Sequence, residues 1–129
     1  MRNLGLIGGL GPGATVHYYE ELVRLGAGET LIVHADVDHA RNFVERDDRA
    51  GLADYFARLI ERLARGGADF AAISAVTPHI CIRELERITP LPLVNIIDST
   101  GRKFAFSRGS LVLLASDAKP AAPAAAPVP

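Results

Sequence analysis

Short apolar runs alternate with amphipathic segments along most of the chain. Residues 4–8, 31–33, 70–73 and 93–97 form apolar runs of the kind that is typical of buried β-strands. Between these runs, apolar side chains recur at the three- and four-residue spacing of a helix. The predicted helical stripes are Thr15, Tyr18, Tyr19, Leu22 and Val23; Leu52, Tyr55, Phe56, Leu59, Ile60 and Leu63; and Cys81, Leu85 and Ile88. Gly66-Gly67 should end the second helix, and Pro90 the third.

This alternation predicts an α/β fold with three αβα layers and a mainly parallel sheet of four to five strands. Residues 1–100 form one such domain in this interpretation. Residues 101–116 are a degraded continuation with one candidate strand, at 111–115, and no amphipathic helix follows it. Residues 117–129 are rich in Ala and Pro and are expected to be a disordered tail.

Composition and charge narrow the class of protein. The 129 residues, 49% hydrophobic and 22% charged, suffice for one domain with a buried core. A formal net charge of −1 argues against nucleic acid and membrane surfaces as partners. The sequence shows neither a signal-peptide pattern nor an apolar run of membrane-spanning length, so a cytoplasmic location is expected. The single cysteine excludes an internal disulfide and a cysteine-rich zinc site.

Candidate chemistry gathers where the predicted strands end, because parallel sheets bind ligands beyond the carboxyl ends of their strands. Segments 8–13, 34–41, 74–79 and 98–100 would meet there. The first contains Gly9-Leu10-Gly11-Pro12-Gly13-Ala14, which matches the G-x-G-x-x-G/A dinucleotide fingerprint, with Asp36 near the end of the second strand. Against this, Pro12 lacks the backbone N–H that a pyrophosphate loop would use. The alternatives are a purely structural glycine turn or a site for one carboxylate at the following helix N-terminus.

The polar stretch 36–48 offers two kinds of site. His34, Asp36, Asp38 and His39 could be imagined as metal ligands, but a run of this kind is more often a solvated loop, and no metal is expected. Arg41 carries a planar guanidinium that would grip a carboxylate bidentately beside the strand ends. The alternative for Arg41 is an exposed, solubilising side chain.

The turn at 74–79 and the helix after it hold the remaining candidates. Thr77 could offer its hydroxyl to a ligand oxygen, and His79 could act as an acid or base. Thr77 could equally cap the next helix, with Pro78 at the first helical position. Cys81 shares a helical face with Leu85, so a buried structural cysteine is favoured over a reactive thiol.

Several segments in order resemble the aspartate/glutamate racemase family. These segments are LGLIGGLGPGAT, LIVHADVDHAR, GGADFAAISAVTPH and PLPLVNIID, which together cover about residues 3 to 100. The resemblance implies cofactor-independent racemisation of amino acids, without pyridoxal phosphate or metal, by two cysteines on two facing α/β halves. It also implies substrate contacts at Gly9, Arg41, Val76 and Thr77, with a small amino acid or dicarboxylate as the partner.

The chain departs from this family at the turn. Ala75 stands at the position of the family's first catalytic cysteine, and its methyl group cannot accept a proton. The family's second half, with its own cysteine turn, has no counterpart after Thr100. We therefore interpret the chain as a truncated and impaired racemase-family domain, with homo-oligomerisation as an open expectation. The alternatives are a non-catalytic remnant that binds an acidic ligand and a dinucleotide-binding module.

Overall fold

The computed structural model describes residues 3–24, 28–74 and 80–94. Their elements are β1 (Leu4–Gly8), α1 (Pro12–Arg24), β2 (Thr30–His34), α2 (Val37–Glu45), α3 (Arg49–Arg65), β3 (Phe70–Ile73), α4 (Ile82–Ile88) and β4 (Leu93–Val94). None of the described helices is long and apolar enough to cross a membrane. The candidate strand at 111–115, the tail at 117–129 and positions 95–97 of the predicted fourth strand lie outside the described residues.

The four described strands form one parallel sheet in the order β2-β1-β3-β4. β1 is an inner strand: Ile7 is in register with Val33 of β2 on one side and with Ile73 of β3 on the other. Because the strands are parallel, their carboxyl ends meet at one edge of the sheet. The segments that follow β1, β2 and β3 are therefore brought to the same edge.

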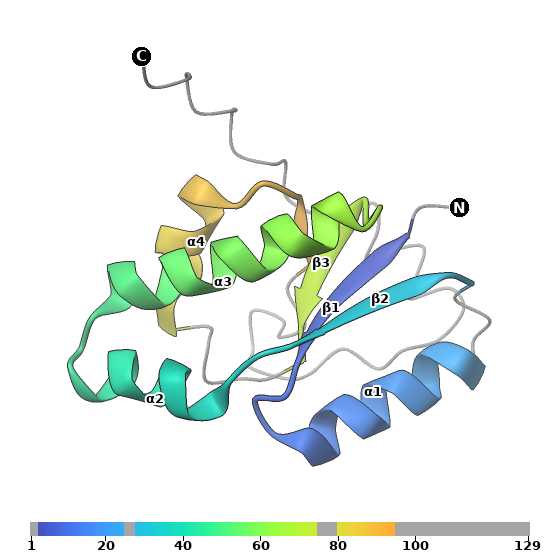
Figure 1. The fold of residues 1–129 in the computed structure, drawn as a ribbon, viewed down its shortest axis with the longest axis horizontal. Coiled ribbons are helices and arrows are strands. Elements are labelled where there is room, and N and C mark those ends of the chain that lie inside the picture. Colours follow the sequence, from blue (N-terminus) through green and yellow to red (C-terminus); the bar gives the residue numbers. More distant parts are fainter. Residues whose placement is uncertain (1–2, 25–27, 75–79, 95–129) are drawn as a thin grey trace.

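Helices cover both faces of this sheet (Figure 1). α3 and α4 lie on one face and α1 lies on the other, which confirms the predicted three-layer α/β fold. The main core lies between the sheet and α3, where Phe56 and Ile60 pack with Ile7 and Ile73. Full burial of a side chain of this size contributes about 1.5–3 kcal/mol to folding. The apolar side chains predicted on one face of α3 thus form the main packing contact with the sheet.

α1 buries less of its surface than its apolar stripe predicts. Tyr18 and Leu22 are buried, whereas Tyr19 and Val23 are 52% and 62% exposed. Tyr18 and Leu22 lie four residues apart and so share one face of the helix. Tyr19 and Val23 come one residue later, which turns each of them about 100° further round the helix axis. Only one side of the predicted stripe therefore reaches the sheet.

The polar stretch 36–48 is mostly a helix, α2, which corrects the prediction of a solvated loop. Asp36 is its N-cap: one carboxylate oxygen accepts hydrogen bonds from the backbone N–H groups of Asp38 (3.0 Å) and His39 (3.3 Å). The backbone N–H of Asp36 donates to the Tyr55 hydroxyl of α3 at 2.8 Å. The ring of His39 packs edge-on against Tyr55, at 4.8 Å between centroids. These contacts fix the start of α2 on α3.

α4 begins at Ile82, with Cys81 at its N-cap position. The alternative in which Thr77 caps a helix that starts at Pro78 falls outside the described residues. Cys81 and Leu85 are fully buried, in agreement with the predicted core face. Ile88 was expected on the same face but is 46% exposed. It is the last residue of the helix, where the chain leaves α4 for β4, so the core contact ends one turn earlier.

Candidate functional site

The candidate site lies at the carboxyl edge of the sheet, around the ends of β1 and β3. The chain leaves β1 through α1 to reach β2 on one side, whereas β3 pairs on the other side of β1. A sheet in which neighbouring strands are reached in opposite directions has a topological switch point, and ligands of open α/β sheets bind there. The glycine loop after β1 and the segment after β3 flank this point.

Gly8 and Gly9 of the glycine loop have to be glycine because neighbouring groups approach their backbone closely. Gly9 has a φ of +89°, which side chains rarely adopt. A Cβ atom at Gly9 would lie 2.5 Å from Nδ1 of His34 and 2.7 Å from the carbonyl oxygen of Ala35. A Cβ atom at Gly8 would lie 2.6 Å from the Thr15 side chain. The absence of side chains at these positions lets the loop sit between the end of β2 and the first turn of α1.

A chain of hydrogen bonds joins this loop to β3. The backbone N–H of Gly9 donates to Thr15 Oγ1 at 2.9 Å. Thr15 Oγ1 lies 3.3 Å from Ser74 Oγ, and Ser74 Oγ donates to the carbonyl oxygen of Ile7 at 3.0 Å. The Thr15 hydroxyl also lies 3.4 Å from the carbonyl oxygen of Gly11, so its single proton is shared between Gly11 and Ser74 as acceptors. The amide of Gly9 is thus bonded to Thr15, and the contact of Gly9 with a substrate stays a prediction.

Sequence reasoning did not single out Thr15 and Ser74 as site residues. Ser74 is 1% exposed and directly follows the apolar strand β3. A hydroxyl placed directly after a buried strand, at the edge where ligands bind, was the signal that could have identified it. Thr15 was read only as part of a helical stripe, although it sits in the first turn of α1, beside the glycine loop.

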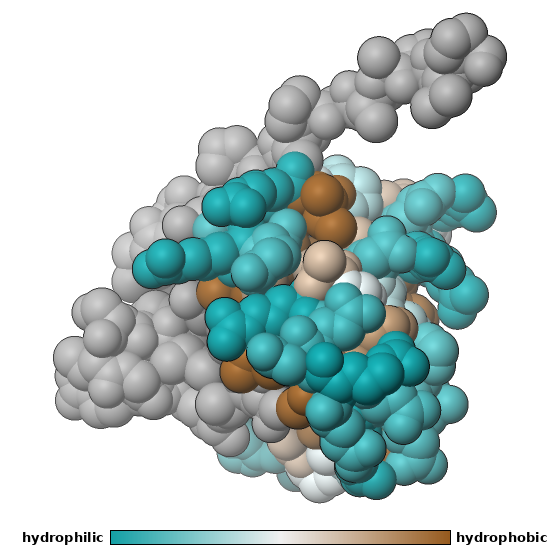
Figure 2. All heavy atoms as spheres, turned by 90° about the vertical axis from the view of Figure 1, so that its left-hand side faces the viewer, coloured by the Kyte–Doolittle hydropathy of each residue, from teal (hydrophilic) through white to brown (hydrophobic). Residues whose placement is uncertain are grey.

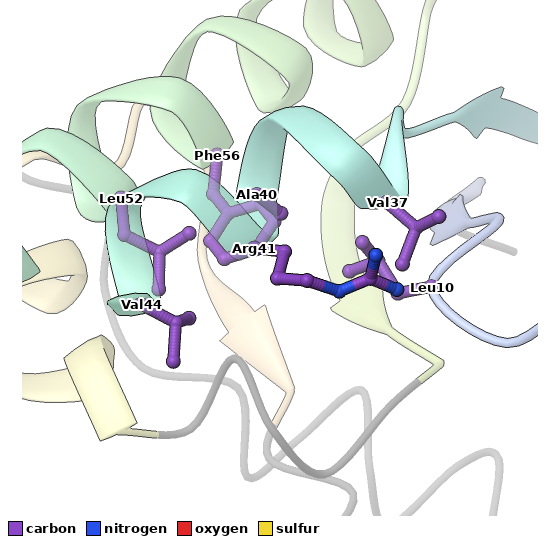
Figure 3. Close-up of a pocket in the computed structure, with 7 residues that line it drawn as sticks. All are labelled: Leu10, Val37, Ala40, Arg41, Val44, Leu52 and Phe56. Carbon is purple, nitrogen blue, oxygen red and sulfur yellow. The ribbon is translucent and has the colours of Figure 1, made fainter. Parts of the chain in front are cut away.

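Arg41 lies on α2 and faces a pocket of about 220 Å³ (Figure 3). Val37, Ala40 and Val44 line the pocket from the same helix, Leu52 and Phe56 line it from α3, and Leu10 lines it from the glycine loop. Figure 3 shows the Arg41 side chain extending from α2 towards Leu10 and Val37. The arginine predicted to grip a carboxylate is therefore next to the glycine loop, on a helix rather than in a loop.

The charge of Arg41 is only weakly engaged. Its guanidinium donates to Asp38 Oδ1 at 3.0 Å, one helical turn away. The two side chains are 58% and 80% exposed, and exposed pairs of this kind typically contribute only about 0.2–1 kcal/mol. A ligand carboxylate can therefore replace Asp38 as the partner of Arg41, or bind Arg41 beside Asp38, at a small cost in free energy.

The other predicted groups fall into two sets. Ala75, Val76, Thr77 and His79 lie outside the described residues. Cys81 is described: it is fully buried, and burial, together with Glu84, raises the pKa of its thiol to about 11. The carboxylate of Asp36, which a dinucleotide site would use to bind a ribose, caps α2.

Within residues 3–24, 28–74 and 80–94, no three His, Cys, Asp or Glu side chains gather as they would around a metal ion.

Comparison with known proteins agrees with this arrangement. The chain is similar to the crystal structure of a candidate Asp/Glu racemase from Yersinia pestis, with 25% identity and a TM-score of 0.67, over 78% of this chain and 47% of that one. It is also similar to an aspartate racemase homologue from Pyrococcus horikoshii OT3, with 26% identity and a TM-score of 0.66, over 76% and 46%. The chain thus spans about half the length of these solved relatives.

A family model described as Asp/Glu/Hydantoin racemase matches residues 7–126, which is most of the chain. The match includes the glycine loop, the Thr15–Ser74 hydrogen bond and the Arg41 pocket. The resemblance carried by the four sequence segments is thereby confirmed, and the chain belongs to the Asp/Glu/hydantoin racemase family.

Proposed function

We propose that this chain binds a small amino-acid-type carboxylate through Arg41 and does not racemise it. The family activity is amino-acid racemisation without a cofactor, and in this chain the proton-transfer step is lost at Ala75. The observation that carries the proposal is the position of Arg41, whose exposed guanidinium lies over a pocket beside the glycine loop.

The binding half of the proposal rests on the chemistry of the pocket. A guanidinium presents parallel N–H donors that match the two oxygens of a carboxylate. Arg41 is the one cation among the described residues that line the pocket. Thr77 retains the hydroxyl that the family resemblance assigns to substrate binding, and it follows β3 by four residues in the sequence.

The loss of proton transfer rests on side-chain chemistry. Abstraction of an α-proton needs a base near the substrate, and general acid–base groups typically contribute about 10²–10⁴-fold to rate. The methyl group of Ala75 has no basic atom. Cys81 is the chain's one thiol, and a buried thiol with a pKa of about 11 is protonated near neutral pH and inaccessible to substrate. No cysteine in this chain can replace the missing base.

The dinucleotide alternative has less support from the described contacts. The N–H of Gly9 is bonded to Thr15, Pro12 has no N–H to offer, and the carboxylate of Asp36 is bonded within α2. A pyrophosphate would need free amides in this loop.

Two measurements on the purified chain test the proposal. Incubation with L-aspartate, L-glutamate or L-leucine, followed by chiral chromatography, is expected to show no enzyme-dependent D-isomer. Calorimetric titration with the same amino acids is expected to show weak binding that Arg41→Ala lowers about ten- to a hundredfold, since a hydrogen bond to a charged group contributes about 1.5–3 kcal/mol.

Arg24→Ala is the matched control for the titration. Arg24 is 61% exposed and paired with Glu21 at i,i+3, as Arg41 is paired with Asp38, but it lies on α1 and does not line the pocket. It should leave binding unchanged. Measurable D-amino acid would refute the lost-base half of the proposal. In a parallel titration with NAD, tight binding that Arg41→Ala leaves unchanged would refute the carboxylate half.

A further inference from the structure

One face of α2 is built to line a pocket. Val37, Ala40, Arg41 and Val44 stand at i, i+3, i+4 and i+7, and all of them line the same 220 Å³ space. Val37 and Val44 are apolar residues that remain 39% and 36% exposed. Helix formation alone does not require apolar residues at these positions. Ala40 also belongs to the main core, so the exposed part of this face that borders the pocket comes from Val37, Arg41 and Val44.

The opposite wall and the end of the pocket are also apolar. Leu52 and Phe56, four residues apart on α3, are 1% and 0% exposed and close its inner side. Leu10 of the glycine loop adds a further apolar side chain. The described surface on the α2 side of the molecule is mostly hydrophilic (Figure 2), so this lining is a local exception.

Charge in and around the pocket favours a ligand with one carboxylate. Arg41 is the single charged side chain among the described residues that line the space. Beyond Val44 and Leu52, the neighbouring surface carries Asp47, Asp48 and Arg49, of which Arg49 is 3.7 Å from Asp47. A second carboxylate on the ligand would lose its water against apolar walls or meet this net negative group.

We propose that this pocket selects amino acids with an apolar side chain, which deepens the proposed function and rests on it. Arg41 holds the α-carboxylate at the rim, and a branched aliphatic or aryl group fills the space between α2 and α3. The volume of about 220 Å³ lies below the roughly 300–1,000 Å³ typical of drug-sized ligands, so it suits a ligand of amino-acid size. Aspartate and glutamate fit the walls poorly.

L-Leucine and L-aspartate are the probes that test this selectivity. They share the same α-carboxylate and α-amino group and have side chains of similar branching, so a difference in affinity reports on the side chain alone. We expect the full chain to bind leucine at least tenfold more tightly than aspartate in calorimetric titrations at neutral pH.

Variants of the exposed pocket valines then locate the effect. Val37→Thr combined with Val44→Thr replaces a methyl with a hydroxyl at two positions and leaves the buried core untouched. We expect this pair to weaken leucine binding about tenfold and to change aspartate binding little, because apolar contact is lost at two positions. Val16→Thr combined with Val23→Thr makes the same exchange at exposed positions on α1, away from the pocket, and should change neither affinity.

The outcomes separate this inference from the function on which it rests. Aspartate binding as tight as leucine, with dependence on Arg41 but none on the valine pair, would overturn the selectivity and leave the carboxylate site standing. Binding of neither probe, or binding that Arg41→Ala does not alter, would overturn the proposed function itself. Circular dichroism of each variant confirms that the compared chains are folded.

Discussion

At the scale of single residues, Cys81 and Arg41 show what residue type alone can and cannot predict. Cys81 lies four residues before Leu85, and that spacing correctly predicted a buried thiol. The chemistry of Arg41 was also readable, because a guanidinium suits a carboxylate wherever it lies. Its surroundings were not, since the walls of the pocket come from α3 and the glycine loop, which only tertiary packing brings to α2.

The buried thiol makes the stability of the fold depend on pH in the alkaline range. Burial raises the pKa of Cys81 from an ordinary value of 9.0 to about 11, so the folded state favours the neutral thiol. The stability gained from this preference is present below pH 9 and is lost as the pH rises towards 11. We expect the free energy of unfolding to fall by about 2 kcal/mol over this window, since one pKa unit corresponds to about 1.36 kcal/mol.

Urea unfolding of the parent chain and of Cys81→Ala, at several pH values from 7 to 11, checks this prediction. The variant should be less stable at pH 7, because a buried sulfur is removed, yet its stability should fall less steeply above pH 9. Burial also raises the pKa of Tyr18, but Tyr18 is present in both chains and cancels from the comparison. Parallel curves would show that Cys81 is not the group that titrates.

At the scale of elements, apolar runs were better predictors than polar ones. β1 and β3 have the predicted bounds because each is a continuous apolar run followed by a glycine or a serine. α2 was missed because polar residues dominate its sequence, although Asp36 before Val37 is a standard helix start. The order of the strands could not be predicted from the sequence, because periodicity indicates which face of a strand is buried but not which strands pair.

The start of α2 depends on one carboxylate, and this gives a prediction for the element. Removing the Asp36 side chain leaves the backbone N–H groups of Asp38 and His39 without their acceptor. We expect Asp36→Ala to lower the free energy of unfolding by about 1 kcal/mol, the usual effect of losing an N-cap, while Asp36→Asn keeps an oxygen acceptor and most of the stability. Urea denaturation of the three chains measures this. Equal losses in both variants would mean that charge, not capping, is what Asp36 contributes.

At the scale of the whole molecule, the two faces of the sheet are held unequally. α3 contributes six buried side chains to its face, whereas α1 contributes two to the other. Local opening is easiest where few apolar side chains hold an element in place. The fold is therefore expected to loosen first at α1, while α3 stays on the sheet.

Hydrogen exchange monitored by mass spectrometry or NMR tests this order of opening. We expect the central amides of α1 to exchange at least tenfold faster than those of α3 under native conditions. The two helices have 13 and 17 residues, so both have interior amides that fraying does not reach. Equal protection of both helices would show that α1 is held by more than Tyr18 and Leu22.

The hydrogen-bonding partners around Ser74 are synthesised at different times. Gly9 and Thr15 are six residues apart and can meet almost as soon as both have left the ribosome, but Ser74, which follows β3, comes 59 residues after Thr15. At about 5–20 residues per second, translation separates the two by roughly 3–12 s. During that interval Thr15 lacks its hydrogen bond with Ser74, and the carbonyl of Ile7 lacks its two bonds from Ser74. The glycine loop is thus made well before Ser74, the residue that completes its hydrogen bonds.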